Sequence, residues 1–278
     1  MQILRVDFSS EIGFGHLKRA TLFNEQLKMK SEKCVIICKE CEQKYIDIPI
    51  IKINNENEFF EVVERLQPKE VVVDNYDFTY EDEKRFKELF PTIKLICFDD
   101  MYKKHYCDEI INPNLCKKTY KNLPSFTKVL YTGPLISEKF KKVKSKREGI
   151  FICFGATDVK NVIIKVLKLL KNKKQPIYVY TTSANKNIKL LKRFCKINKN
   201  CKLHIDEDVA KGMQKAEVGI ISASTLSYEA MKSGMAFIAV RVVDNQNEMM
   251  KCLKSKRKKV IDIRNIRKLK WMLQSYLT

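Results

Sequence analysis

Residues 2–29 read QILRVDFSSEIGFGHLKRATLFNEQLKM. The first seven of these residues form an apolar run that predicts a β-strand, and residues 16–29 predict a helix. Between them lies GFGH, residues 13–16, which holds two of the 8 glycines and one of the 3 histidines of the chain. Glycine lets the backbone turn tightly and approach a ligand closely. A strand, a glycine-containing turn and a helix in this order indicate the start of a parallel α/β sheet.

The same alternation of strand and helix continues along the chain. In the first half, CVIIC, EVVVDNY and KLICFDD predict strands, and NEFFEVVERLQ and EDEKRFKELF predict helices. In the second half, strands are expected at GIFICFG, IYVYTT, KLHI, VGIIS and AFIAV, with helices over 159–172, 186–197, 207–215, 225–233 and 245–257. The segment between the halves is polar and basic, and we expect residues 139–148 to be a linker. The predicted fold is therefore α/β, with two doubly wound, Rossmann-like domains, 1–138 and 149–278, facing a cleft.

Composition sets limits on the class of protein. The 278 residues are 45% hydrophobic, which suits ordinary cores, and no apolar run approaches the ~18 residues that a membrane span needs. The N-terminus reads as a strand and not as a signal peptide, so we expect a soluble, cytoplasmic protein without a transmembrane segment. We expect a monomer.

The formal net charge of +21 suggests either a solvated basic surface or an anionic partner. Residues 251–278 are the most basic segment, with ten Lys or Arg residues and one Asp. No nucleic-acid-binding module is recognisable, and aromatic residues do not interleave with the basic ones, so no nucleic-acid partner is expected.

The ten cysteines are expected to be structural. Cys97 and Cys153 lie inside apolar strand-like runs, where a reduced thiol acts as a small hydrophobic filler. Cys34, Cys38 and Cys41 have the C-x3-C-x2-C spacing of radical iron–sulfur enzymes. The strand predicted between the first two keeps them extended, whereas a cluster needs a loop wrapped around it, so we favour a structural role.

His16 is the candidate for acid–base chemistry. It occupies the first turn of the first predicted helix, where the helix dipole disfavours the imidazolium form and leaves a ring able to accept a proton. Asp7, at the end of the preceding strand, could orient it. The alternative is a histidine that only caps the turn.

Other polar residues follow the predicted strands of the first half. Asp74, Asn75 and Tyr76 end one strand, and Asp99 and Asp100 end the next. Paired acids at such ends can bind a metal or the hydroxyl and amide groups of a sugar, although they also serve routinely in turns. We favour turn chemistry for the Asp99–Asp100 pair and a substrate contact for Tyr76.

The second half carries further signals at its strand ends. FGATD, residues 154–158, is a candidate phosphate or sugar cradle. The hydroxyls of residues 222–225, SAST, precede a helix whose free N–H groups suit a diphosphate. Glu229, just over one turn further on, can accept both hydroxyls of a ribose. The amides of residues 245–247, NQN, can contact sugar hydroxyls.

Together these motifs resemble those of known enzymes. The second half is similar to the donor domain of GT-B glycosyltransferases. The opening RVDFSSEIGFGHLKR closely resembles that of UDP-2,4-diacetamido-2,4,6-trideoxy-β-L-altropyranose hydrolases, the UDP-sugar hydrolases of pseudaminic acid biosynthesis. DNY, FDD, FICFGATD, ISASTLSYEA and NQ follow in that family's order. One departure is Ala156, which stands where the family has the second Gly of Gly-Gly-Thr-Asp.

The resemblance implies a site and a reaction. Water would attack the anomeric carbon of a UDP-sugar with inversion, UDP would leave, and His16 would be the base. No metal and no cofactor is implied. The residues assigned to substrate binding are Gly15, Arg19, Tyr76, Gly155, Thr157, Asp158, Ser224, Glu229, Asn245 and Gln246.

Two other functions stay open. A GT-B glycosyltransferase that uses a UDP-amino sugar would need an acceptor before it released UDP. A basic protein that binds nucleic acid or anionic lipid would bind in a salt-sensitive manner and would not depend on Glu229.

Overall fold

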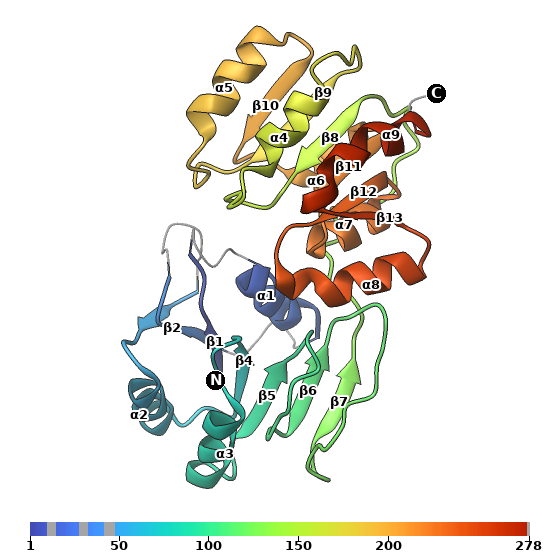
Figure 1. The fold of residues 1–278 in the computed structure, drawn as a ribbon. Helices are drawn as coiled ribbons and strands as arrows, with labels where there is room; N and C mark the ends of the chain where they lie inside the picture. The colour runs from blue at the N-terminus through green and yellow to red at the C-terminus, as the bar shows by residue number, and fades with distance from the viewer. Residues whose placement is uncertain (10–14, 28–32, 42–47, 277–278) are drawn as a thin grey trace. The chain divides into compact units, whose positions relative to one another are not determined.

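The structure is a computed structural model, and it describes residues 1–9, 15–27, 33–41 and 48–276. The chain divides into two compact units, Met1–Leu135 and Ile136–Thr278. Each unit is a parallel sheet with helices on both faces (Figure 1). Among the described residues, no helix is both long and apolar enough to cross a membrane.

Unit 1 contains a seven-stranded sheet in the order β3-β2-β1-β4-β5-β6-β7, and all of its paired strands are parallel. Its elements are β1 (Gln2–Val6), α1 (Gly15–Leu27), β2 (Cys34–Cys38), β3 (Ile50–Lys52), α2 (Glu56–Leu66), β4 (Glu70–Asp74), α3 (Tyr80–Leu89), β5 (Lys94–Phe98), β6 (Glu109–Asn112) and β7 (Lys128–Tyr131).

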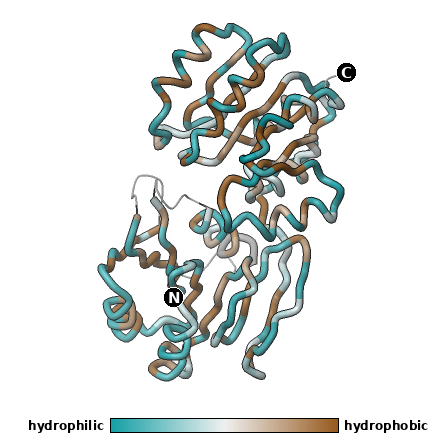
Figure 2. Tube along the Cα trace, in the orientation of Figure 1, coloured by the Kyte–Doolittle hydropathy of each residue, from teal (hydrophilic) through white to brown (hydrophobic). Residues whose placement is uncertain are grey.

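The two faces of this sheet are covered by different helices. Successive side chains of a strand point to opposite faces. In β1, Ile3 packs in one cluster with Phe59 of α2 and Phe86 of α3, whereas Leu4 packs in another with Phe23 of α1. The central strands are therefore buried on both sides, and they form hydrophobic stretches of the chain (Figure 2).

Unit 2 contains a six-stranded parallel sheet in the order β10-β9-β8-β11-β12-β13. Its elements are β8 (Ile150–Cys153), α4 (Val162–Leu169), β9 (Ile177–Thr181), α5 (Ile188–Ile197), β10 (Cys201–Ile205), α6 (Val209–Lys215), β11 (Val218–Ser222), α7 (Thr225–Ser233), β12 (Ala236–Arg241), η2 (Asp244–Gln246), α8 (Asn247–Ser255), β13 (Lys259–Asp262), η3 (Ile263–Lys268) and α9 (Leu269–Gln274). Helices α4, α5 and α9 contribute to one core cluster with Ile152 and Val179 of the sheet.

The strand order of each sheet reverses direction at one place. In unit 1 this switch lies between β1 and β4, and in unit 2 it lies between β8 and β11. Open α/β sheets bind ligands beyond the carboxyl ends of their strands at such a switch point. The topology therefore directs attention to the residues that follow these four strands.

The predicted α/β class with two doubly wound units is confirmed, and the expected helices match α1 to α8 within a few residues. The cleft expected between the two domains stays a prediction. The segment expected to be a linker packs on unit 2: Phe140 is buried, Gln214 Nε2 donates to Lys139 O, and Arg147 donates to Ser233 O. The boundary between the two compact units, after Leu135, therefore lies before this segment.

The cysteines follow the prediction in part. Cys97 and Cys153 are buried, as expected for fillers of the core. Cys38 and Cys41, however, form a disulfide, as do Cys195 and Cys201. The expectation of a structural role for the C-x3-C-x2-C segment holds, but two of its three thiols are bonded to each other. The strand between Cys34 and Cys38 is β2, as predicted.

Candidate active site

The carboxyl edge of the unit 1 sheet holds a histidine–aspartate pair. His16 lies in the first turn of α1, and Asp74 is the last residue of β4, on the opposite side of the switch point. His16 Nδ1 is 2.6 Å from Asp74 Oδ1. The Asp74 carboxylate can only accept here, so Nδ1 carries a proton, and in the neutral ring Nε2 then carries the lone pair. The pair therefore presents a ring nitrogen that can accept a proton from a reactant.

Arg19 fixes the carboxylate of this pair. One helical turn beyond His16, it donates to both oxygens of Asp74, from Nε at 2.7 Å and from NH2 at 2.6 Å. Burial opposes ionisation of Asp74, but the Arg19 guanidinium and its hydrogen bonds outweigh burial and hold the pKa of Asp74 well below its usual range. The carboxylate thus stays charged at any pH at which an enzyme works.

Tyr76 and Asp100 complete the cluster. The Tyr76 ring lies edge-on to the His16 ring with centroids 4.6 Å apart. Its hydroxyl donates to Asp100, which also accepts from Arg19 NH1 at 2.8 Å. Burial, with the Asp100 carboxylate, raises the pKa of Tyr76 well above its usual range, so the phenol remains a hydrogen-bond donor. Lys103 Nζ donates to Tyr76 O and holds the turn after β4.

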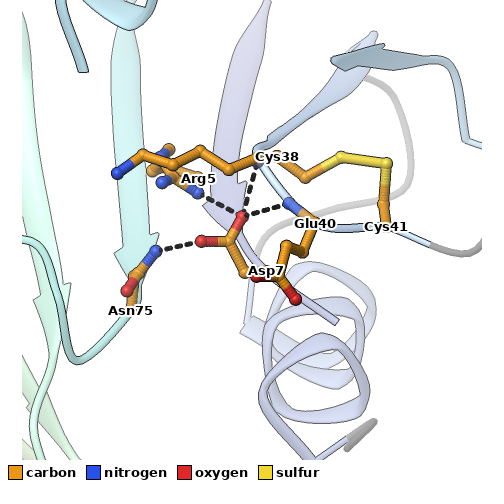
Figure 3. The surroundings of a disulfide bond; sticks show 7 residues. Arg5, Asp7, Cys38, Glu40, Cys41 and Asn75 are labelled. Atoms are coloured by element: carbon orange, nitrogen blue, oxygen red, sulfur yellow. Dashed lines mark hydrogen bonds and ion pairs between the residues drawn. A yellow bond between two sulfur atoms is a disulfide. The ribbon is translucent and has the colours of Figure 1, made fainter. Parts of the chain in front are cut away.

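The sequence left open whether Asp7 orients His16, and in the structure the Asp7 carboxylate bonds to other groups. It accepts from Arg5 NH1 at 2.8 Å, from Lys39 N at 2.6 Å and from Asn75 Nδ2 at 2.7 Å. Figure 3 shows Asp7 joining β1, the turn after β2 and the turn after β4, beside the Cys38–Cys41 disulfide. Asp7 therefore links the strand and the turns next to the site, and Asp74 orients His16.

In unit 2, the turn after β8 leaves backbone open to a ligand. Gly155 has φ +82°, a conformation that favours glycine, and a Cβ at this position would meet nothing within 4 Å. Open space beside a glycine backbone allows close approach of a ligand. Thr157 follows, half-buried. The structure thus leaves both predicted contacts available to a ligand.

Asp158 is predicted from the sequence to contact substrate, but in the structure its carboxylate has another role. It is 4% exposed, and its two carboxylate oxygens accept from Val162 N at 2.8 Å and Ile163 N at 3.0 Å, in the first turn of α4. Burial raises its pKa to about 6, although these two N–H donors oppose the rise. Both oxygens are committed to the helix, so Asp158 positions the turn and does not offer its carboxylate to a ligand.

The turn after β11 leads into α7. Ser224 is the N-cap of this helix, and its hydroxyl lies 2.7 Å from that of Ser222. The next residue, Thr225, is exposed, so hydroxyls and helix N–H groups meet at this end of α7. Glu229 is in the same helix and only 2% exposed. Its predicted ribose contact stays a prediction.

The turn after β12 carries the predicted amides. Asn245 is exposed, whereas Gln246 is half-buried and accepts through Oε1 from Val242 N at 2.7 Å. The bond leaves the Gln246 amide nitrogen as the donor toward a ligand. Since β8, β11 and β12 are neighbours and parallel, Gly155, Ser224 and these amides follow adjacent strands at one edge of the sheet.

Some predicted positions lie outside the described residues, among them Gly13 and Phe14 of the opening loop. Gly15 begins α1, and a Cβ there would meet nothing within 4 Å. Two functional candidates were underrated from the sequence. Asp74 was noted only as a strand end, and Asp100 was assigned to turn chemistry. Their positions after neighbouring parallel strands, β4 and β5, were the signal that could have joined them to the site.

Solved structures with the same architecture define the class of fold. MurG of Acinetobacter baumannii matches 99% of this chain and 90% of its own with a TM-score of 0.64 at 13% identity. UGT89C1 of Arabidopsis thaliana, complexed with UDP-L-rhamnose, matches 99% and 89% with a TM-score of 0.68 at 9% identity. The chain has the GT-B fold of glycosyltransferases, with two Rossmann-like units.

Sequence comparison narrows the class to a family. No protein-family model matches the chain. The UDP-2,4-diacetamido-2,4,6-trideoxy-β-L-altropyranose hydrolase of Campylobacter jejuni is 34% identical over 260 residues, which cover 88% of this chain and 92% of that protein. An uncharacterized protein of Methanocaldococcus jannaschii is 26% identical over 88% of this chain and 55% of its own length. The chain belongs to the family of these UDP-sugar hydrolases.

Proposed function

We propose that this protein hydrolyses UDP-2,4-diacetamido-2,4,6-trideoxy-β-L-altropyranose to the free sugar and UDP, as a step in pseudaminic acid biosynthesis. The observation that carries the proposal is the bond of 2.6 Å between His16 Nδ1 and Asp74 at the carboxyl edge of the unit 1 sheet. Membership of the hydrolase family supports the choice of substrate.

In the proposed reaction, His16 is the general base. The Nδ1–H group of His16 donates a hydrogen bond to Asp74. The lone pair on Nε2 takes a proton from water as the water oxygen bonds to the anomeric carbon. The bond from that carbon to the diphosphate oxygen breaks, UDP leaves with the electron pair, and the anomeric configuration inverts. General-base assistance of this kind is worth about 10² to 10⁴ in rate.

The Asp74 carboxylate has two effects in this scheme. It holds the ring in one tautomer, and it stabilises the imidazolium that forms when Nε2 takes the proton. Arg19 keeps Asp74 ionised and immobile through two hydrogen bonds, and Tyr76 restricts the ring from its edge. We assign Tyr76, Gly15 and Arg19 to the surroundings of the sugar.

The nucleotide is assigned to unit 2. Open backbone at Gly155 and the N-terminal end of α7, with Ser224 and Thr225, supply donors that suit a diphosphate. Glu229, Asn245 and Gln246 are assigned to uridine and ribose. UDP is a good leaving group, so stabilisation of the departing diphosphate and placement of the water are the main tasks.

The test is UDP release from the purified protein with this UDP-sugar and no acceptor. Sustained release supports a hydrolase. Release only after an acceptor sugar is added would contradict the proposal in favour of a GT-B glycosyltransferase. Binding of nucleic acid or anionic lipid without turnover would contradict it in favour of a binding protein.

A further inference from the structure

A second cluster of reactive side chains lies inside unit 1. It consists of Glu83 on α3, Cys97 on β5, and His105 and Cys107 in the segment between β5 and β6. One ligand atom from each lies within 4.8 Å of the others, and all four residues are buried. We propose that these four side chains bind a structural Zn²⁺ ion. The inference does not depend on the proposed function.

The donor set matches the chemistry of zinc. Two thiolates, one imidazole nitrogen and one carboxylate oxygen form a four-coordinate set of the kind that Zn²⁺ takes in structural sites. Soft sulfur ligands disfavour Mg²⁺ and Ca²⁺, which prefer oxygen alone. At Zn–S and Zn–N lengths of about 2.3 and 2.0 Å, tetrahedral ligands are roughly 3.3–3.8 Å apart. To reach that geometry, the widest pair must close by roughly 1 Å, and Glu83 Oε1 and His105 Nδ1, which are 2.7 Å apart, must separate by roughly 0.6 Å.

His105 supplies an independent observation. Its side chain is 7% exposed, Nδ1 lies 2.7 Å from Glu83 Oε1, and Nε2 faces Asp99 Oδ2 at 3.3 Å. Nε2 has no hydrogen bond of normal geometry in the described structure. Histidines that ligate a metal through one ring nitrogen usually donate from the other to a carboxylate. Nδ1 is therefore the ligating atom, and Asp99 is the carboxylate that orients the ring.

Binding of Zn²⁺ displaces one proton from each thiol of Cys97 and Cys107. It also displaces the Nδ1 proton of His105, so that the ring binds as neutral imidazole with its proton on Nε2. Glu83 binds as the carboxylate, and its second oxygen continues to accept from Tyr106 N. Affinity is therefore expected to fall as the pH is lowered.

The proposed ion would hold the segment that completes the candidate active site. Asp99 accepts from Met101 N at 2.8 Å and from Lys103 N at 3.0 Å, and it precedes Asp100. Asp100 in turn contacts Arg19 and Tyr76. A metal that fixes His105 and its Asp99 partner would order the turn that carries Asp100, with no part in the chemistry.

The test measures metal content and coordination in the full chain. Protein produced with added zinc, handled without oxygen or thiol reductant so that its disulfides stay intact, and dialysed against metal-free buffer, is expected to retain about one Zn²⁺ per chain by mass spectrometry. Replacement by Co²⁺ is expected to give thiolate charge-transfer and tetrahedral d–d bands. Cys97→Ser and Cys107→Ser each leave one thiol in the cluster and should lose at least half of the thiolate band, while Cys34→Ser, which removes a free thiol of the same unit outside the cluster, should keep all of it.

Measurements on the wild-type chain alone can overturn the proposal, so the test still decides if a variant fails to fold. Retention of less than a tenth of a zinc ion per chain, with no thiolate band on addition of Co²⁺, would make the cluster a metal-free hydrogen-bonded network. Thiolate bands of undiminished intensity in both Cys97→Ser and Cys107→Ser would place the metal elsewhere and would equally overturn it.

Discussion

Replacing Asp74 by Asn tests the orientation of the proposed base. Asn is nearly isosteric but has one accepting oxygen, and Asp74 accepts from both His16 and Arg19. If the Asn oxygen faces Arg19, its amide group donates to His16 Nδ1, and the ring proton moves to Nε2. A ring protonated on Nε2 cannot accept a proton from water there.

The size of the expected fall in kcat follows from the loss of the general base. General-base assistance contributes about 10² to 10⁴ in rate, which corresponds to about 2.7 to 5.4 kcal/mol of transition-state stabilisation. We therefore expect Asp74→Asn to lower kcat for UDP release by about 10² to 10⁴ with a smaller change in KM. Arg19 retains its 2.8 Å bond to Asp100, so the variant is expected to fold.

The assay is steady-state release of UDP, with a thermal melt of each variant as the check on folding. Asp7→Asn is the matched control, because Asp7 is also an acid after a strand of this sheet but bonds Arg5 and Asn75 instead of His16. Its kcat is expected to change far less. A folded Asp74→Asn variant with unchanged kcat, or an equal loss in both variants, would show that Asp74 does not orient the base.

Three further predictions concern other residues. His16→Ala is expected to keep UDP binding, measured by calorimetry, and to lose about 10² to 10⁴ in turnover; an unchanged rate would remove His16 from its role. Gly155→Ala forces a side chain into φ +82°, so we expect a loss of about 1 kcal/mol of stability and weaker UDP binding, and a variant with wild-type melting and affinity would contradict this. Asp158 has a folded pKa raised to about 6, so its contribution to stability is greatest below the unfolded pKa of 3.8 and declines as the pH rises through 6. Asp158→Asn should flatten that decline in melts between pH 4 and 7, and an identical pH profile would show that another group causes it.

The sheet plan could be predicted from the sequence wherever helices alternate with strands. Residues 225–233 were expected to be a helix, and α7 spans Thr225–Ser233. By contrast, β6 and β7 were missed, since irregular segments and not helices join β5, β6 and β7. The short β3 and β13 were missed as well. Where no helical periodicity separates two strands, a run of two or three apolar residues is too short to identify a strand.

The partners within the site were harder to predict than its location. His16 and Asp74 are 58 residues apart, and they meet because β1 and β4 are neighbours at the switch point. Asp7 was the nearer choice along the chain, but its carboxylate is taken by Arg5 and by backbone of the neighbouring turn. Likewise, Asp158 was read as a ligand contact because a carboxylate at a strand end can bind ligand or cap a helix, and only the fold decides.

The central claim is that water, activated by His16, attacks the anomeric carbon of the UDP-sugar. The most direct test is turnover in water enriched in a heavy isotope of oxygen, followed by mass spectrometry of both products. Attack at the anomeric carbon places the label on the free sugar and none on UDP. Label on UDP would mean attack at phosphorus and would contradict it.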